Sequence, residues 1–275
     1  MRILNIDPDP IHYIAYKVVA PRQREDRGQR VMQDTLFPVL KGTVDVLPKG
    51  SDALLLASDL QGHCLVNDEY KLIGEVMPEE LKLLLEIEYS DILPLKTSVV
   101  LCGDLYAETH RRGGLGDVRN IWFAFREYFQ RVIGVGGNHD MIGENNSKID
   151  AFQREKDIFY LEDNVVKIDE LTFSGISGII GSNRKLNRKE ETVFLKSLKK
   201  MLLKKTDMLL LHEGPDFPKS DFPGTSSIRE VIEKSPPTLI CCGHTHWAEP
   251  LREFDNGSQV LNLEGRAVLL TAVQD

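Results

Sequence analysis

The sequence predicts an α/β fold, and two patterns carry that prediction. Short apolar runs of four to six residues recur along the chain without polar alternation, which is typical of strands buried on both faces. Segments with helical spacing lie between several of these runs, and alternation of strands and helices indicates an α/β protein. The runs end at clusters of Asp, Asn, His and Gly, and in open α/β sheets ligands bind beyond the carboxyl ends of the strands.

Five apolar runs are the predicted core strands. They comprise residues 53–57, 98–102, 131–135, 208–211 and 238–242. Each is followed directly by polar residues, in order Ser58-Asp59, Gly103-Asp104, Gly136-Gly137-Asn138-His139-Asp140, His212 and Gly243-His244-Thr245-His246. We therefore expect these polar side chains to lie at one edge of the sheet structure.

Four segments between and after the core strands predict helices. Residues 78–87 begin with Pro and acidic residues, which favour a helix N-terminus. Residues 118–129 carry aromatic and aliphatic side chains at helical spacing. Asn187 is a candidate N-cap for a helix over 188–204, and residues 225–234 predict a further short helix.

Both ends of the chain look rich in strands. Residues 251–263 predict a hairpin, because the Asn256-Gly257 pair favours a tight type I′ turn, and residues 267–273 predict one more strand. Near the N-terminus, residues 11–20 and 35–46 are candidate strands, and the highly charged segment 21–30 is a predicted loop. No internal repeat or linker is evident, so we expect one domain over 1–275 with residues 1–50 as an N-terminal β elaboration.

Composition narrows the classes of function. The chain has 275 residues, is 41% hydrophobic and 28% charged, and carries a formal net charge of -8, which makes nucleic acid an unlikely partner. No apolar run approaches the roughly 18 residues that a membrane span needs, and the N-terminus lacks the apolar core of a signal peptide. The four cysteines form no C-x-x-C pair, so we expect reduced thiols and a cytoplasmic location. The oligomeric state is not indicated.

The residues at the strand ends form a mixed nitrogen and oxygen ligand set. The set consists of Asp59, Asp104, Asn138, His139, His212, His244 and His246. Such donors suit Mn, Fe, Zn, Co or Ni, and they lack the thiolates of a structural zinc site. They are too many for one tetrahedral ion and suit two divalent ions about 3.5–4 Å apart that share a carboxylate.

The ordered series SDLQG, GD, GNHD, H and GHTH resembles the calcineurin-like metallophosphoesterase superfamily, over roughly residues 53–265. This resemblance implies a four-layer αββα sandwich, in which two mixed β-sheets are flanked by helices. It also implies the following roles: Asp104 bridges two metal ions, Asp59 and His246 hold the first, Asn138, His212 and His244 hold the second, and His139 acts on the leaving group with Asp140 as its partner.

One position departs from the family pattern. Gln61 stands where the first motif, D-x-H, has histidine, and an amide oxygen is a weaker donor than imidazole to such metals. Three interpretations stay open: Gln61 ligates the first metal weakly, it hydrogen-bonds a metal-bound water, or His63 replaces the missing ligand. We expect a tight second site and a weak first site. We also expect Gly103, Gly137 and Gly243 to let the backbone turn sharply at the ligands.

The resemblance implies hydrolysis of a small phosphorylated substrate, with a small-molecule or nucleotide phosphodiester as the first choice. A phosphomonoesterase or protein phosphatase is the alternative within the enzyme class. A second alternative is an inactive scaffold that binds proteins, because Gln61 is the kind of change such members carry. Arg111 and Arg112 are candidate phosphate-binding residues, since guanidinium pairs with phosphate through two parallel hydrogen bonds, although a solvated loop is the simpler interpretation.

Overall fold

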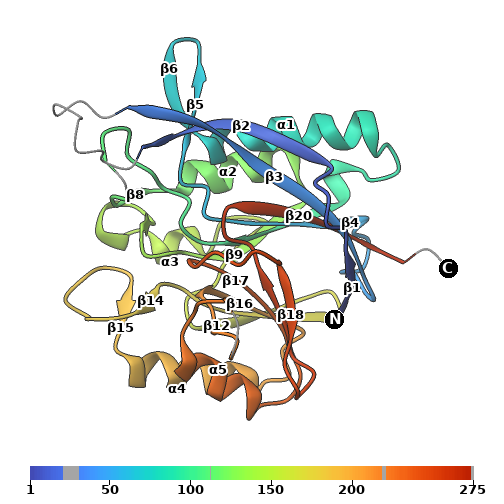
Figure 1. Ribbon diagram of the computed structural model, residues 1–275, viewed down its shortest axis with the longest axis vertical. Helices are drawn as coiled ribbons and strands as arrows, with labels where there is room; N and C mark the ends of the chain where they lie inside the picture. The colour runs from blue at the N-terminus through green and yellow to red at the C-terminus, as the bar shows by residue number, and fades with distance from the viewer. Residues whose placement is uncertain (21–30, 112, 219–220, 274–275) are drawn as a thin grey trace.

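Two large mixed β-sheets lie face to face, with helices on their outer sides (Figure 1). The computed structural model describes residues 1–20, 31–111, 113–218 and 221–273. The ten-stranded sheet contains, in spatial order, β11 (Ile158–Tyr160), β9 (Arg131–Val135), β7 (Thr97–Cys102), β4 (Ala53–Ser58), β20 (Arg266–Ala272), β3 (Met32–Val44), β2 (His12–Val19), β5 (His63–Val66) and β6 (Glu69–Leu72), with β1 (Ile3–Ile6) paired to β3.

The second large sheet has six strands. They are β12 (Asn164–Ile168), β13 (Leu171–Ile176), β16 (Met208–Glu213), β17 (Leu239–Gly243), β19 (Gln259–Asn262) and β18 (Leu251–Glu253) in spatial order. Two short pairs, β8 (Gly116–Asp117) with β10 (Asp140–Met141) and β14 (Ile179–Ile180) with β15 (Arg188–Lys189), lie outside the large sheets. The α-helices are α1 (Ile73–Glu88), α2 (Arg119–Tyr128), α3 (Ile149–Phe152), α4 (Glu191–Leu202) and α5 (Ser226–Glu233).

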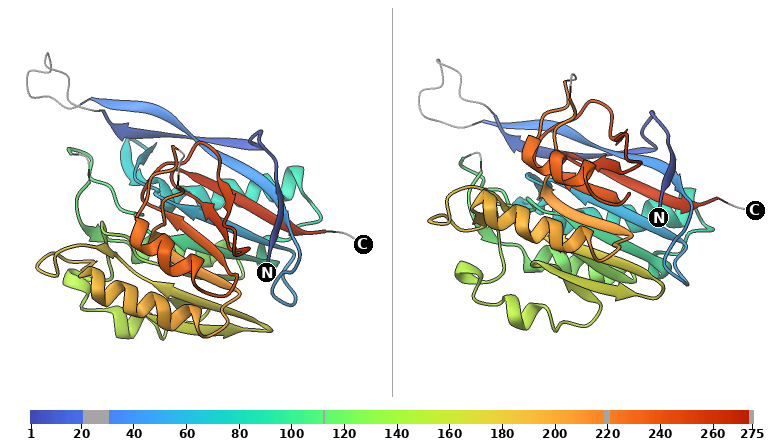
Figure 2. Two further views of the ribbon diagram at one scale, coloured as in Figure 1. Left: turned by 60° about the horizontal axis from the view of Figure 1, so that its bottom comes forward. Right: turned by 90° about the horizontal axis from the view of Figure 1, so that it is seen from below.

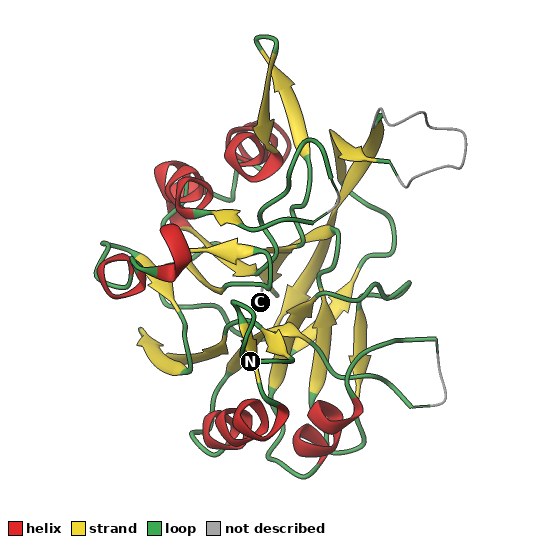
Figure 3. Cartoon of the chain, turned by 90° about the vertical axis from the view of Figure 1, so that its left-hand side faces the viewer, coloured by secondary structure: helices red, strands yellow, loops and turns green. Residues whose placement is uncertain are grey.

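Successive side chains of the buried strands point to opposite faces of each sheet, and the buried residues form three hydrophobic clusters. In β4, Leu55 faces the cluster formed with α1 and α2, whereas Leu54 and Leu56 face the cluster between the two sheets. On the far side of the six-stranded sheet, Leu209 and Leu211 of β16 pack with α4 and α5. This arrangement confirms the predicted αββα sandwich, and the turned views in Figures 2 and 3 show the helices outside and the strands between them.

Two of the four predicted helices begin at different residues from those expected. Helix α1 begins at Ile73, so Pro78 lies inside it rather than at its start. The Glu75 carboxylate accepts the backbone N–H of Leu72 at 3.2 Å and thereby supports the earlier start. Helix α4 begins at Glu191, because Arg188 and Lys189 form β15.

The predicted hairpin is present, but its turn differs from the expected type I′. Strands β18 and β19 pair antiparallel, and the N–H of Phe254 bonds the Ser258 carbonyl. Only Gly257 of the loop residues has positive φ, at 82°, whereas a type I′ turn needs two such residues. A three-residue loop that ends in a left-handed glycine therefore closes this hairpin.

The N-terminal strands are an integral part of the ten-stranded sheet. Strand β3 lies between β2 and β20 and pairs parallel with β20 from Val39 to Val44. The predicted loop 21–30 lies outside the described residues. No helix within the described part of the chain is long and apolar enough to cross a membrane.

Candidate metal centre

The carboxyl ends of five strands deliver the candidate ligands to one region between the sheets. Strands β4, β7 and β9 are parallel neighbours, as are β16 and β17, so each set presents its ends at a common edge. The two edges are joined directly, since His212 of β16 bonds the carbonyl of Cys102 in β7. The fold therefore brings the ends of β7 and β16 into contact.

The backbone at three of these residues adopts the left-handed region. Asp59, Asp104 and His244 have φ angles of 56°, 51° and 70°. Such conformations are sparsely populated by residues other than glycine, and they persist where surrounding contacts impose them. They turn the chain sharply after each strand.

The three glycines do not share the role that the sequence suggested. Only Gly103 has a positive φ, at 89°. At Gly137 and Gly243 the requirement is space: a Cβ atom would lie 2.1 Å from Oδ1 of Asp104 and 2.2 Å from Oδ2 of Asp59, respectively. These two glycines let backbone approach the candidate ligand carboxylates closely, and only the first supplies a turn.

Asp104, His212 and His244 form a compact group of ligand atoms. One ligand atom from each side chain lies within 4.8 Å of the others. The Nε2 atom of His212 lies 3.2 Å from Oδ2 of Asp104. On the other side of the ring, Nδ1 of His212 donates to the Cys102 carbonyl at 2.8 Å, which orients the imidazole. Against the lowering effect of burial, the carboxylates of Asp104 and Asp59 raise the pKa of His212 to about 10, so a cation bound here would displace the ring's proton.

One buried polar atom in the loop that follows β9, Oδ1 of Asn138, has no hydrogen-bond partner among the described residues. Unpaired buried polar atoms are costly, so its presence points to a missing partner. Nε2 of His212 lies beside the Asp104 carboxylate. These nitrogen and oxygen atoms have the chemistry that Mn, Fe or Zn prefers. The residues present therefore fit a divalent metal ion.

Electrostatics support the same conclusion. Burial and the nearby Asp104 carboxylate raise the pKa of Asp59 to about 7, although the charge of His212 opposes this shift. Burial and the charge of His212 lower the pKa of His244 to about 4, so this imidazole is neutral and able to ligate. Asp104 has a lowered pKa, because its contacts with His212 outweigh the effect of burial. A cation here would replace protons as the partner of the clustered carboxylates.

The residues assigned to the first metal lie less close together than Asp104, His212 and His244. Oδ2 of Asp59 accepts hydrogen bonds from the Ser58 hydroxyl at 2.7 Å and from the His244 backbone N–H at 3.1 Å. Nε2 of Gln61 donates to Oδ2 of Asp104 at 3.2 Å. The His246 side chain is 66% exposed, and its Nδ1 lies 2.7 Å from Oε2 of Glu264 rather than at the Asp104 group.

His63, the alternative to Gln61, lines the same cavity as Asp59 and Gln61. This cavity has a volume of about 320 Å³. The His63 side chain is buried on β5, its ring contacts Tyr70 edge to face, and its Nδ1 has no hydrogen-bond partner among the described residues. Burial lowers the pKa of His63, so the ring is neutral near pH 7. Both proposed substitutes for the missing histidine thus border one space.

His139 lies beside the carboxylate of Asp104. Its backbone N–H donates to Oδ1 of Asp104 at 3.0 Å, and its Nε2 lies 3.9 Å from Oδ2 of the same residue. Nδ1 of His139 is 2.5 Å from the carbonyl of Gly114, which therefore accepts its proton. This bond orients Nε2 toward the metal centre.

Asp140 has different partners from the expected His139. Oδ1 of its buried carboxylate accepts the backbone N–H groups of Leu105, at 2.7 Å, and Tyr106, at 3.2 Å, and Oδ2 accepts that of Gly137 at 2.8 Å. The Gly114 carbonyl occupies the position that the sequence suggested for Asp140. Asp140 instead holds together the two loops that follow β7 and β9.

The family model for calcineurin-like phosphoesterases matches residues 54–248, which is most of the chain. The chain belongs to the calcineurin-like phosphoesterase family. No curated protein shows significant similarity to it. Among solved structures, it is similar to a protein of unknown function, AQ665 from Aquifex aeolicus, with 12% sequence identity, coverage of 64% of this chain and 83% of that one, and a TM-score of 0.32.

The two arginines proposed to bind phosphate differ in what the structure shows. In this calcineurin-like phosphoesterase, Arg111 forms an ion pair with Glu108, with Nε 2.6 Å from Oε2, and its side chain is 59% exposed. Arg111 also lines the 320 Å³ cavity beside Asp59 and Gln61. Arg112 lies outside the described residues.

Sequence reasoning missed two residues that shape the phosphoesterase site. Glu264, which holds the His246 ring, follows the end of β19 and so obeys the same strand-end pattern as the ligands. Tyr16 of β2 lines the 320 Å³ cavity, and its ring packs against Gly62, where a Cβ would lie 2.2 Å from Cδ2. No pattern in the sequence joins Tyr16 to the site, because the contact depends on how β2 and β5 pair.

Proposed function

We propose that this calcineurin-like phosphoesterase hydrolyses small-molecule or nucleotide phosphodiesters, using two divalent metal ions. One observation carries the proposal: the Asp104, His212 and His244 group lies beside Nε2 of His139, which is 3.9 Å from Oδ2 of Asp104. A phosphate at this group would meet a metal centre and a proton donor at once. That combination serves phosphoester hydrolysis, which needs an activated water and a protonated leaving group.

The donor set supports one stronger and one weaker metal site. Asp104, Asn138, His212 and His244 would hold the stronger ion, and the buried Oδ1 of Asn138, which has no hydrogen-bond partner among the described residues, is available for it. Asp59 would hold the weaker ion together with His63, or with Gln61 once its amide turns to present its oxygen. His246 would join them by leaving Glu264. When bound, such ions offset phosphate charge and lower the pKa of bound water toward about 7.

The residues of the chain supply orientation and proton transfer. The Gly114 carbonyl fixes the His139 ring, so a proton on Nε2 points to the metal centre, where the leaving oxygen would lie. Asp140 fixes the loop that presents Asn138 and His139 by accepting the Gly137 N–H. These contacts preorganise the site before substrate arrives.

The net charge of the chain supports the proposed class of substrate, and its free cysteines support a cytoplasmic location. The net charge of -8 favours a small phosphorylated substrate over nucleic acid. Arg111 borders the 320 Å³ cavity and is placed to pair with a substrate phosphate if it leaves Glu108. The four cysteines are free, and three of them are buried, which fits the reducing cytoplasm.

A second candidate rests on Gln61 and on the exposed position of His246. A phosphoesterase fold that has lost its first metal site can serve as a protein-binding scaffold. The oriented ring of His139 favours catalysis instead, since a scaffold has no use for a proton donor held at the metal centre.

The decisive experiment compares bis(p-nitrophenyl) phosphate with p-nitrophenyl phosphate, with added Mn²⁺ and with Asp104→Asn as the control variant. Turnover of the diester in preference to the monoester, abolished in Asp104→Asn, supports the proposal. Preference for the monoester favours a phosphomonoesterase. No turnover with Mn²⁺, Fe²⁺ or Zn²⁺, together with absence of bound metal by elemental analysis, favours the scaffold.

A further inference from the structure

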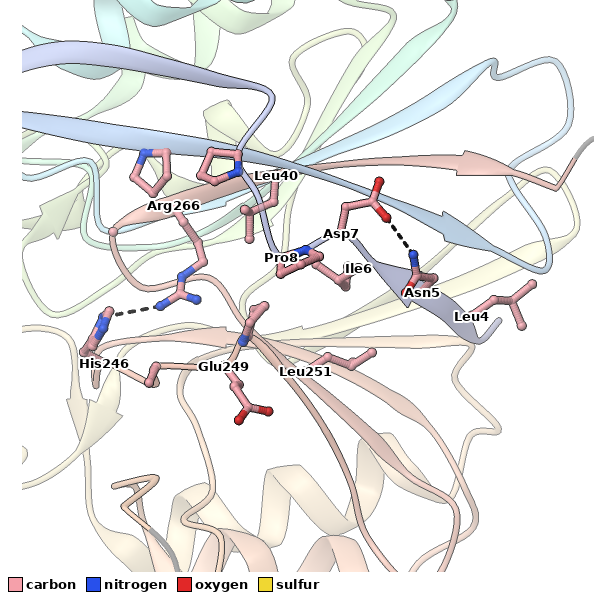
Figure 4. A pocket seen from close by; sticks show the side chains of 15 residues that line it. Leu4, Asn5, Ile6, Asp7, Pro8, Leu40, His246, Glu249, Leu251 and Arg266 are labelled. Carbon is pink, nitrogen blue, oxygen red and sulfur yellow. Dashed lines mark hydrogen bonds between the residues drawn. The ribbon is translucent and has the colours of Figure 1, made fainter.

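A second cavity opens next to the metal centre, between the N-terminal strands and the loop that follows β17. Its volume is about 590 Å³, within the range of small-molecule sites. One wall comes from β1, the residues that follow it and β3, and the other comes from the segment that contains His246 and from the start of β20 (Figure 4). Residues that lie far apart in sequence therefore enclose it.

The walls of this cavity are mostly apolar, with one buried cation and the carboxylates of Asp7 and Glu249. Leu4, Ile6, Leu40 and Leu251 and several prolines supply the apolar surface. Arg266 also lines it and is only 6% exposed. Its guanidinium donates to the carbonyls of Trp247 and Glu264. Burial lowers the pKa of Arg266, and the charge of Glu264 opposes this shift only in part. A buried guanidinium whose charge is only partly offset is suited to an acceptor or anionic atom of a ligand.

Two residues connect the cavity to the metal centre. Gly265 lines both this cavity and the 320 Å³ cavity that holds Asp59 and Gln61. A Cβ atom at Gly265 would meet nothing within 4 Å, so the space at the junction is open. His246, two residues beyond His244, stands on the cavity wall with Nδ1 3.4 Å from the guanidinium of Arg266 (Figure 4).

The proton donor lies on the other side of the site. His139 packs against Gly113, which lines the 320 Å³ cavity, and none of the described residues between 104 and 141 lines the 590 Å³ cavity. The leaving oxygen must lie at His139 to receive its proton. A group in the 590 Å³ cavity is therefore the substituent that stays on phosphorus.

We propose that the 590 Å³ cavity binds the retained substituent of a phosphodiester, and that this substituent is an apolar or aromatic group with an acceptor or anionic atom that meets Arg266. The inference rests on the proposed phosphodiesterase function and names the substrate class for the same site. It predicts selectivity for diesters whose retained group is bulky, whatever the leaving group.

The test compares two diesters with the same leaving group, bis(p-nitrophenyl) phosphate and methyl p-nitrophenyl phosphate, in the Mn²⁺-loaded full chain. Ala248→Trp places an indole in the cavity from an exposed position, and Pro8→Trp does so from the opposite wall. Ala151→Trp, on the exposed face of α3, is the matched control. We expect both cavity variants to lower kcat/KM for the bis-aryl diester about tenfold. The same variants should change kcat/KM for the methyl diester less than twofold. The control variant should change neither value.

A binding measurement gives a readout independent of turnover. By calorimetry, the unmodified chain is expected to bind phenylphosphonate at least tenfold more tightly than methylphosphonate, and Ala248→Trp is expected to remove that preference. Equal losses on both diesters, or no loss on either, in variants that melt normally would overturn the cavity proposal and leave the phosphodiesterase function standing. Failure of the unmodified chain to hydrolyse either diester would overturn the function itself and the subsite with it.

Discussion

The side-chain amide of Gln61 donates a hydrogen bond to Oδ2 of Asp104 at 3.2 Å. A carboxylate only accepts, so the amide nitrogen, and not the oxygen, faces the proposed bridging ligand. In this arrangement Gln61 offers no lone pair to an ion that Asp104 would share. A histidine at the same position would offer an imidazole nitrogen, which binds Mn, Fe and Zn well.

The first prediction concerns this substitution. We expect Gln61→His to tighten the weaker Mn²⁺ site by about tenfold or more, comparable to the 10–100-fold changes seen when the surroundings of metal ligands are altered. Isothermal titration of the metal-free protein with Mn²⁺ measures the change. Gln61→Leu is the control, because it keeps a similar volume without a metal-binding atom and should leave the first site no tighter. Two equally tight sites in the unmodified protein would contradict the expected asymmetry.

The second prediction concerns His212, whose buried Nε2 lies 3.2 Å from Oδ2 of Asp104. His212→Ala removes a proposed ligand outright, so we expect Mn²⁺ affinity of the stronger site to fall by at least about 100-fold, beyond the loss caused by outer partners alone. His12→Ala is the matched control, since His12 is a surface residue that contacts Glu80. Metal content after dialysis, measured by elemental analysis, distinguishes the two variants. Full metal retention in His212→Ala would exclude this residue as a ligand.

The fold was predictable to the extent that burial left a signature in the sequence. The uninterrupted apolar run of β4 predicted a strand buried on both faces, and Leu54 and Leu55 do face opposite layers. The starts of α1 and α4 were not predictable in the same way. In α1, the Glu75 carboxylate accepts the backbone N–H of Leu72, and this contact outweighs the helix-start signal at Pro78. In α4, Arg188 pairs with β14, and this pairing outweighs the helix-start signal at Asn187.

The candidate site likewise has features that the sequence predicts and features that depend on tertiary packing. Asp104, His212 and His244 were found from their places after apolar runs, because strand ends converge whatever the details of the loops. The partner of His139 was not, since Gly114 presents a backbone carbonyl, which carries no residue-specific signal. The contact of His246 with Glu264 likewise depends on how the chain returns after β19. Motif spacing therefore predicts which residues gather, and tertiary packing decides their partners.

The third prediction assigns His139 to protonation of the leaving group. We expect His139→Gln to lower kcat by about 10²–10⁴-fold, the usual contribution of a general acid, without loss of bound metal. The loss should be largest for diesters with a poor, alkyl leaving group and smallest for p-nitrophenyl, which leaves without a proton. His110→Gln, at an exposed residue near the site, is the control. A loss that is the same for all leaving groups would assign His139 a purely structural part.

The fourth prediction follows from the three backbone N–H groups that Asp140 accepts. Asp140→Ala leaves buried donors of Leu105 and Gly137 unpaired, at a cost of about 1–3 kcal/mol for each. We expect the free energy of unfolding to fall by about 3 kcal/mol, measured by urea denaturation, whereas Asp150→Ala on the exposed face of α3 should change it by less than about 0.5 kcal/mol. Metal affinity should fall as well, because the loop held by Gly137 presents Asn138. Unchanged stability with a selective loss of activity would show instead that Asp140 acts on the reaction and not on the loops.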